Sequence, residues 1–209
     1  MRLSTALVLS LVPLVFAGSQ SSWTNTPPTL EPLFTAELEV VPNPAPILPG
    51  PKGIRVDCAI TGGTVTGKHG LNGSIRPDSS DWAILDPRTG LAFADARWAL
   101  RLPPTKSTGG QDAFVYVQSS GPSAPPYAAG GLVLHLRLVL ETGVPEYYWL
   151  NNVVVIGLLE MRDVGNVLDP TSTRVEVIRI RAYTIDSAWK PTDKVFTVCP
   201  FDGCLSLID

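Results

Sequence analysis

The sequence predicts an all-β protein built as a single antiparallel, lipocalin-like β-barrel. Short β-branched and aromatic runs recur along the chain, Gly, Asn-Gly or Pro ends each run, and no stretch has a convincing amphipathic helical pattern. Strands spaced in this way are typical of a barrel or a sandwich. We favour the barrel because closure hides the strand edges and creates one interior pocket. At 209 residues the chain has room for one such domain.

The two ends of the chain differ in composition from its centre. Met1–Ala17 has a basic start, an apolar centre and a small-residue cleavage site, which is typical of a secretory signal peptide. We expect a flexible Ser-, Thr- and Pro-rich leader at 18–29, the barrel domain at 30–185 and a C-terminal tail at 186–209. No later apolar run is long enough to span a bilayer. The expected location is therefore outside the cell or in the lumen of the secretory pathway.

Within the barrel domain, alternation and turn signals set the expected strands. Leu132, Leu134, Leu136, Leu138 and Leu140 share one face of the clearest strand. The long loop at 119–131 is expected to cover one mouth of the barrel, and the proline-rich stretch 42–52 is expected to be an extended connection. The expected strands are Leu33–Val41, Ile54–Thr61, Thr64–Lys68, Gly73–Arg76, Asp81–Leu85, Leu91–Leu102, Ala113–Gln118, Leu132–Glu141 and Arg174–Ile185.

One apolar segment permits two structures. Tyr147–Met161 is almost wholly apolar and aromatic and is long enough for a helix. The β-branched run Val153–Ile156 favours a strand that is buried on both faces. We therefore expect a strand here.

Cysteine usage fits an oxidising compartment. Three cysteines allow at most one internal disulfide. The turn sequence between Cys199 and Cys204 favours a short-loop disulfide in the tail, which leaves Cys58 as a buried, inert thiol. A bridge from Cys58 to either tail cysteine is the alternative, and its longer loop would stabilise more. Asn72-Gly73-Ser74 is an N-glycosylation sequon, although Asn-Gly also serves a tight turn.

Several classes of function are disfavoured. The formal charge of −3 becomes −4 once Arg2 leaves with the signal peptide, and nucleic-acid binding requires a basic face. His69 and His135 lack the spacing of metal ligands, so we expect no metal. No nucleophile motif or phosphate-binding loop is present, which disfavours covalent hydrolysis and nucleotide cofactors. We expect no cofactor.

The remaining candidates are polar and aromatic side chains on the expected strands. Ligand pockets are mostly apolar and contain a few placed hydrogen-bonding groups. Arg97 is a candidate either to pair with Asp81 or Glu141 across the interior or to polarise a ligand carbonyl or enolate. These same residues would also suit a structural ion pair or plain core. The expected catalytic residues are Arg97, Tyr116, Asn151 and Asp81, and the expected substrate-binding residues are Trp82, Trp149, Tyr148 and Glu141.

A family resemblance covers about residues 30–185. Its signature includes Leu30–Phe34, Ile60–Gly67, Asp81-Trp82, Asp95–Trp98 and Val115–Val117, followed by Glu141–Gly143 and Tyr148–Asn151. In these residues the chain resembles the small lipocalin-like barrels of domain-of-unknown-function family 3237. It departs from the pattern at Ala59, where Pro is usual, and at Trp98, where Tyr is usual. The resemblance implies the barrel but no reaction, and the signal peptide and cysteine tail are similar to those of fungal secreted members.

These features lead to two hypotheses of different class. The first is a cofactor-free cyclase or isomerase of fungal secondary metabolism, of Diels–Alder or hetero-Diels–Alder type, which orients its substrate and polarises a carbonyl. The second is a secreted carrier with the same pocket and no turnover. A structural surface protein is a third, weaker hypothesis. The expected partner is a small apolar, polyketide-like or terpenoid-like molecule, and a homodimer is possible.

Overall fold

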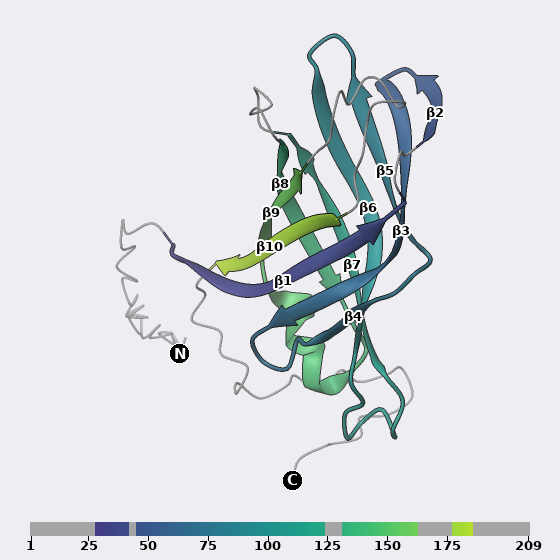
Figure 1. The fold of residues 1–209 in the computed structure, drawn as a ribbon. Coiled ribbons are helices and arrows are strands. Elements are labelled where there is room, and N and C mark those ends of the chain that lie inside the picture. The colour runs from purple at the N-terminus through teal and green to yellow at the C-terminus, as the bar shows by residue number, and fades with distance from the viewer. Residues whose placement is uncertain (1–27, 42–44, 124–130, 163–176, 186–209) are drawn as a thin grey trace, which may run out of the picture.

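The computed structural model describes residues 28–41, 45–123, 131–162 and 177–185. They form ten strands and one 3₁₀ helix (Figure 1). The strands are β1 (Leu30–Val40), β2 (Ala45–Gly50), β3 (Gly53–Gly67), β4 (Gly73–Ile75), β5 (Ser79–Asp86), β6 (Leu91–Leu102), β7 (Ala113–Pro122), β8 (Gly131–Glu141), β9 (Val155–Arg162) and β10 (Val177–Ile185), and the helix is η1 (Pro145–Asn152).

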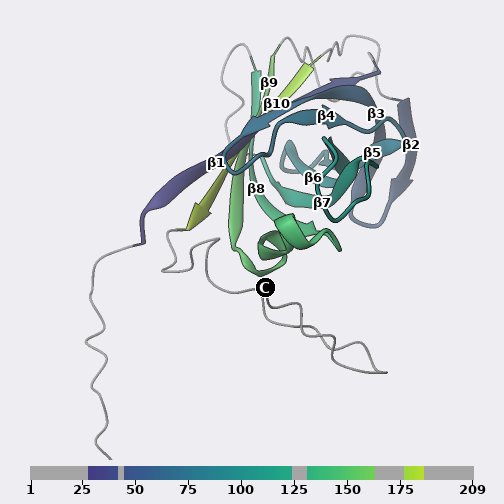
Figure 2. The ribbon, with the colours of Figure 1, turned by 90° about the horizontal axis from the view of Figure 1, so that it is seen from below.

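The strands close into an antiparallel barrel, which confirms the predicted fold class. β3 pairs with β4 and β5, which occupy one strand position in succession, and β6 through β10 follow as neighbours. β1 then pairs with β10 on one side and with β3 on the other, so the described strands form a ring. Figure 2 shows this ring from one end, with η1 near the mouth. Neighbours in the ring follow the order of the chain, so no long crossover is needed.

Strict alternation along the strands decides which side chains point inward. On β6, the residues Ala92, Ala94, Ala96, Trp98 and Leu100 are all buried, whereas the intervening charged residues are more exposed. The five alternating leucines of β8 are likewise buried. The core therefore consists of one face of each strand, as period-two alternation requires.

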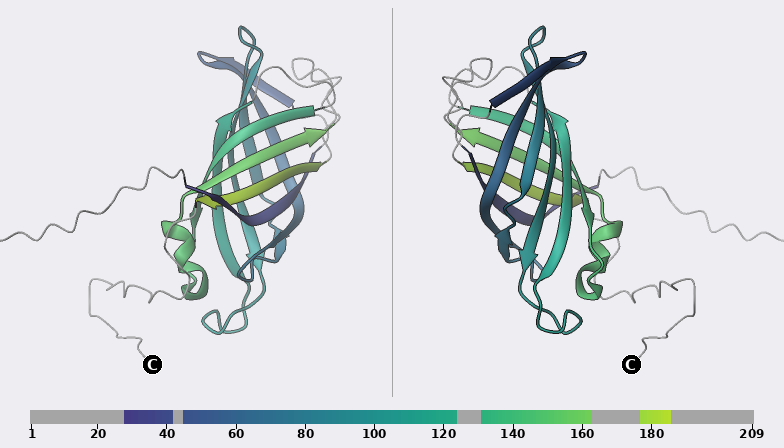
Figure 3. Two further views of the ribbon diagram at one scale, coloured as in Figure 1. Left: turned by 90° about the vertical axis from the view of Figure 1, so that its left-hand side faces the viewer. Right: turned by 90° about the vertical axis from the view of Figure 1, so that its right-hand side faces the viewer.

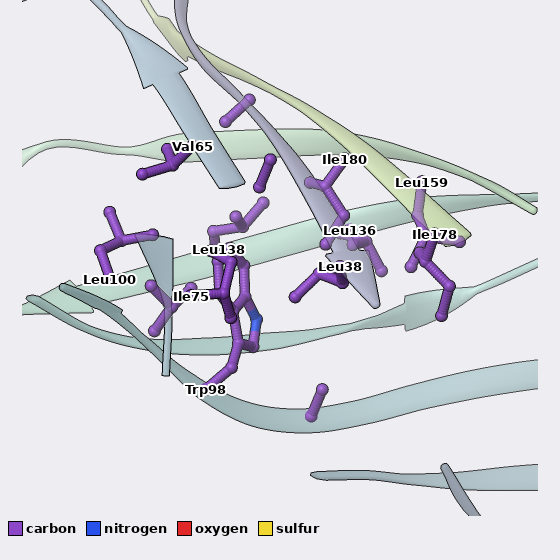
Figure 4. Packing of buried hydrophobic residues seen from close by; sticks show 14 of the residues in the cluster. Leu38, Val65, Ile75, Trp98, Leu100, Leu136, Leu138, Leu159, Ile178 and Ile180 are labelled. Atoms are coloured by element: carbon purple, nitrogen blue, oxygen red, sulfur yellow. The ribbon is translucent and has the colours of Figure 1, made fainter. Parts of the chain in front are cut away.

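Large and small side chains occupy different levels of the interior. Figure 4 shows the large ones, including Leu38, Leu136 and Ile180, packed around Trp98. The rings of Trp98 and Phe34 meet in a T-shaped arrangement, with centroids 6.4 Å apart. Trp98 therefore spans the interior from β6 toward β1, and burying it against Phe34 contributes strongly to the core.

Two expectations about local structure are wrong, the second only in part. The proline-rich stretch 42–52 contains strand β2, which pairs with β3 alone among the described strands. An edge position tolerates prolines because their missing N–H groups are not needed on the outer side. The expected strand over Tyr147–Met161 is confirmed only from Val155, where β9 starts, and the residues before it form η1 with Pro145 in its first turn. The fixed φ of proline favours this helical start. β9 is also not buried on both faces, since Ile156 is 36% exposed.

Several expected features lie outside the described residues. They are the signal peptide, most of the leader, the end of the 119–131 loop and the tail with Cys199 and Cys204. The start of that loop, Ser119–Pro122, belongs to β7. Figure 3 shows that η1 and the connection between β6 and β7 lie toward the same end of the barrel. Ser107 of this connection donates from its backbone N–H to Glu146 of η1 at 3.1 Å.

Candidate functional site

Asp81 is a carboxylic acid inside the barrel. On β5, Ser79, Asp81, Ala83 and Leu85 share one face, and Leu85 belongs to the hydrophobic core. Only 4% of Asp81 is exposed. Its Oδ1 accepts a hydrogen bond from the backbone N–H of Asp95 at 2.9 Å. None of the ion pairs found among the described residues involves Asp81.

This environment shifts the acidity of the side chain. Burial raises the pKa of Asp81 from its ordinary 3.8 to about 6, and the charges of Asp95 and Asp57 add to the rise. The hydrogen bond from Asp95 N–H opposes the shift because it favours the charged form. A carboxyl group with this pKa exchanges protons near neutral pH, which suits general acid–base chemistry.

Cys58 lies opposite Asp81 and is a poor nucleophile. The two residues are direct cross-strand partners on β3 and β5. Burial raises the pKa of the Cys58 thiol to about 12, with further contributions from Asp81 and Asp57. The reactive thiolate is therefore scarce at neutral pH. Within the described part of the chain Cys58 is a free thiol, and its pairing with the tail stays untested.

The side chains level with Asp81 are mostly small. Following the strand register around the wall, Asp81 is aligned with Cys58, Ala96 and Ser119. The adjacent level holds Ala83, Ala94 and Gly121. On the other side lies Trp98, whose indole Nε1–H donates to Ser119 Oγ at 3.2 Å. The acid is thus bordered by small groups and by one aromatic ring with a fixed orientation.

The expectation that Arg97, Tyr116 and Trp82 point into the barrel is wrong. Tyr116 is 55% exposed and Trp82 is 49% exposed. The Nη1 of Arg97 donates to Asp95 Oδ1 at 2.9 Å on the outer face, rather than to Asp81 or Glu141. The physical reason is the period of two, because Ala96 and Trp98 point inward and the residue between them must point outward.

The structure nevertheless brings three predicted residues together on the outside. Arg97, Tyr116 and Glu141 line one hollow of about 370 Å³ in the outer wall. Tyr116 and Glu141 are cross-strand partners on β7 and β8. Arg76, which was not among the predicted site residues, also lines this hollow. The Arg-Pro-Asp sequence after Ile75 predicts a break in the strand. The sequence does not show which face of the sheet this break borders, because strand pairing decides that.

The predicted residues of η1 lie apart from both places. The side-chain amide of Asn151 forms two hydrogen bonds with the backbone of Thr142. Its Oδ1 accepts one from Thr142 N–H at 2.8 Å, and its Nδ2 donates the other to the Thr142 carbonyl oxygen at 2.9 Å. Trp149 packs against the core, and its ring meets that of His69 in a T-shaped arrangement with centroids 5.5 Å apart. Tyr148 is half-buried. This pair of hydrogen bonds is a structural clasp, which uses the Asn151 oxygen and one of its two amide hydrogens on the backbone.

No group of three potential His, Cys, Asp or Glu metal ligands occurs in the part of the chain that the structure covers. No helix among those residues is long and apolar enough to cross a membrane.

The fold and its buried acid define a class: a closed antiparallel barrel with an ionisable group in its wall. The chain belongs to the family described as protein of unknown function DUF3237, whose profile matches residues 28–184. No curated protein matches the chain.

Solved structures show the same barrel. A beta-barrel like protein from Acinetobacter baumannii is 26% identical, with 78% of this chain and 99% of that chain covered and a TM-score of 0.57. A protein of unknown function from Clostridium acetobutylicum is 21% identical, with coverage of 77% and 99% and a TM-score of 0.61. An enzyme from Penicillium herquei is 22% identical, with coverage of 77% and 96% and a TM-score of 0.50.

Proposed function

We propose that the protein is a cofactor-free cyclase or isomerase that acts on a small organic molecule inside the barrel, with Asp81 as the proton-transfer group. The observation that carries this proposal is the position of Asp81: an inward carboxyl, 4% exposed, without a cationic partner among the described residues, and bordered by small side chains. A buried acid that lacks a cation is costly for the fold. Such a cost is typical of functional sites.

The chemistry follows from the protonation state of Asp81. Above about pH 6 the ionised carboxylate would remove a proton from a carbon next to a carbonyl group. Below that pH the neutral acid would donate a hydrogen bond to the carbonyl oxygen, which withdraws electron density from a conjugated alkene. The second form is the one that a Diels–Alder or hetero-Diels–Alder cyclisation would use, since the substrate supplies both reacting partners.

This proposal moves the polarising role from Arg97 to Asp81. Arg97 lies on the outer wall in an exposed pair with Asp95, where solvent weakens its field. Trp98 takes the place that the sequence analysis gave to Trp82 and Trp149, because its ring lies inside the barrel. A polyketide-like or terpenoid-like molecule of fungal secondary metabolism is the proposed substrate class. The likeness of the barrel to an enzyme from Penicillium herquei supports an enzymatic activity and leaves the substrate class as part of the proposal.

The experiment uses a small probe with an exchangeable carbon-bound proton. A cyclic monoketone, whose own α-protons exchange slowly in neutral buffer, is incubated with the protein in D₂O, and loss of the α-proton signal is followed by NMR between pH 4 and 8. We expect faster exchange than in buffer, with a rate that rises through about pH 6 and falls about 100-fold or more in Asp81→Asn. Asp81→Glu should retain part of the rate.

A matched control separates this role from a general loss of charge. Asp112→Asn removes a carboxylate that pairs with Arg101 on the outer face, and it should exchange the probe at the wild-type rate. Equal rates for wild type and Asp81→Asn, with both proteins folded, would refute the proton-transfer role of Asp81.

A non-catalytic carrier is the second candidate. It is favoured by the indole of Trp98, which provides a fixed aromatic surface and already satisfies its own N–H on Ser119. On this alternative an apolar ligand binds with the same affinity to wild type and Asp81→Asn, and no proton exchange is catalysed.

We also propose that the chain is exported and carries a glycan on Asn72. Asn72 is exposed, and its Oδ1 accepts a hydrogen bond from Gly67 N–H at 3.2 Å, which leaves the amide nitrogen for the sugar. Expression in a secreting eukaryotic host should give a mass that falls on enzymatic deglycosylation and in Asn72→Gln. The proposed Cys199–Cys204 disulfide is tested by thiol mapping of the same unreduced sample, and a peptide that links Cys58 to the tail would contradict it.

A further inference from the structure

The outer hollow has a structural origin in a break between two strands. β4 ends at Ile75 and β5 begins at Ser79, so the three residues between them leave the sheet. Asp78 turns the chain with a φ of 71°, and Arg76 N–H remains tied to Ala99 carbonyl oxygen at 2.9 Å. Ala99 points outward, is only 5% exposed and lines the hollow of about 370 Å³ that this break borders.

Two guanidinium groups border this hollow with unused donors. Arg97 engages the protein through Nη1 alone, with Asp95 and with the Ala96 carbonyl oxygen. Arg76 engages Asp78 through Nη2 alone, at 3.4 Å, and its guanidinium lies 5.4 Å from the centre of the Phe114 ring. The remaining nitrogens of both groups have no hydrogen-bond partner among the described residues. A carboxylate is the group that matches the planar fork of arginine.

The opposite wall carries different chemistry. Tyr116 presents a half-exposed aromatic ring, and its hydroxyl makes no hydrogen bond within the described chain. Glu141, its cross-strand partner, also lines the hollow and would repel a second anionic group. Gln118, Asp78 and Ser79 complete the polar lining. A ligand that fits must therefore carry one anion, a flat body and a hydrogen-bond donor at its far end.

We propose that the outer hollow is a second binding site, separate from Asp81, for a small hydroxy-aromatic carboxylate. The carboxylate binds the free edges of Arg97 and Arg76, the ring packs on Tyr116, and the hydroxyl donates to Glu141. The volume of about 370 Å³ lies at the lower end of the range for small-molecule sites, as expected for a single-ring ligand.

The test is an NMR titration of the ¹⁵N-labelled protein with 4-hydroxybenzoate. We expect saturable shifts of the backbone amides of Ala99, Tyr116 and Gln118. The uncharged analogue 4-hydroxybenzamide should bind about tenfold or more weakly, since it lacks the charge-assisted pair. Benzoate, which lacks the hydroxyl donor, should lose affinity in wild type and show no further loss in Glu141→Gln.

Variants assign the site to the hollow. Arg97→Gln and Arg76→Gln should each weaken 4-hydroxybenzoate about tenfold, whereas Arg179→Gln should bind as wild type does. Arg179 is the matched control because it is an outer-face arginine that pairs with Glu37, away from the hollow. The amide spectrum of each variant reports its folding. The proposal is overturned if no saturable shifts occur at the hollow, if 4-hydroxybenzamide binds equally well, or if folded Arg97→Gln binds as Arg179→Gln does.

Discussion

Inside the barrel, the carboxylate of Asp81 accepts a hydrogen bond from the backbone N–H of Asp95 at 2.9 Å. On the outside, the carboxylate of Asp95 pairs with Arg97. The backbone of β6 thus lies between the buried carboxyl group of Asp81 and the exposed ion pair of Asp95 and Arg97. The same residue types have different chemistry on the two sides. Burial raises the pKa of Asp81 to about 6, whereas the outer pair is screened by solvent.

Asp81 should make the stability of the protein depend on pH. Its folded pKa of about 6 lies above the ordinary 3.8, so the folded state binds this proton more tightly and stability falls as the pH rises from about 4 through 6. The shift of roughly two units corresponds to about 3 kcal/mol. We expect Asp81→Asn, which keeps the Oδ1 acceptor, to be more stable than wild type by up to about 3 kcal/mol at pH 7 to 8.

Urea unfolding at several pH values measures this effect. The two proteins should converge below pH 4, where Asp81 is protonated in both the folded and the unfolded state. Asp112→Asn, which alters an exposed outer pair, is the control and should run parallel to wild type. A constant difference between Asp81→Asn and wild type from pH 4 to 8 would contradict the assignment.

Asn151 should contribute to stability rather than to a reaction. Replacement with Ala removes two hydrogen bonds to the backbone of Thr142 and leaves that N–H and carbonyl unpaired. The expected loss is about 1–3 kcal/mol in the free energy of unfolding. Asn152→Ala is a suitable comparison because Asn152 is exposed and forms no hydrogen bond in the described structure. Equal unfolding midpoints for the two variants would rule out the clasp.

Ser119 should fix the orientation of Trp98. In Ser119→Ala the buried indole N–H loses its acceptor, which should cost about 1–2 kcal/mol. The same change in a Trp98→Phe background should cost clearly less, since no N–H remains to be satisfied. A double-mutant cycle in urea measures this difference. Additive effects of the two substitutions would show that the hydrogen bond contributes nothing.

Gly121 should be intolerant of any side chain. A Cβ at this position would lie 1.8 Å from the carbonyl oxygen of His135, so β7 and β8 would have to separate. We expect Gly121→Ala to lose about 3 kcal/mol or more, or to fail to fold. Gly143→Ala is the control, because nothing lies within 4 Å of a Cβ built there. Thermal melting distinguishes them, and similar melting temperatures would contradict the close approach.

Alternation and turn signals were sufficient for most of the barrel. The leucines of Leu132–Glu141 and the run Leu91–Leu102 predicted strands whose observed bounds agree closely, because period two and turn residues are local properties. Alternation and turn signals were not sufficient to predict the structure of Tyr147–Met161. There, η1 begins at Pro145 and its Asn151 is bonded to Thr142, so the first part of the segment is helical, and the strand starts only at Val155, within the β-branched run.

The sequence by itself determined that Asp81, Arg97, Tyr116 and Glu141 lie on strands of one barrel, and that neighbouring residues alternate between its two faces. Only the tertiary structure decided which face is inside. Asp81 shares its face with Leu85 and is buried, whereas Arg97 lies between the inward residues Ala96 and Trp98 and faces solvent. The reason is that a strand has two equivalent faces, and which face is buried is set by the strands that pair with it.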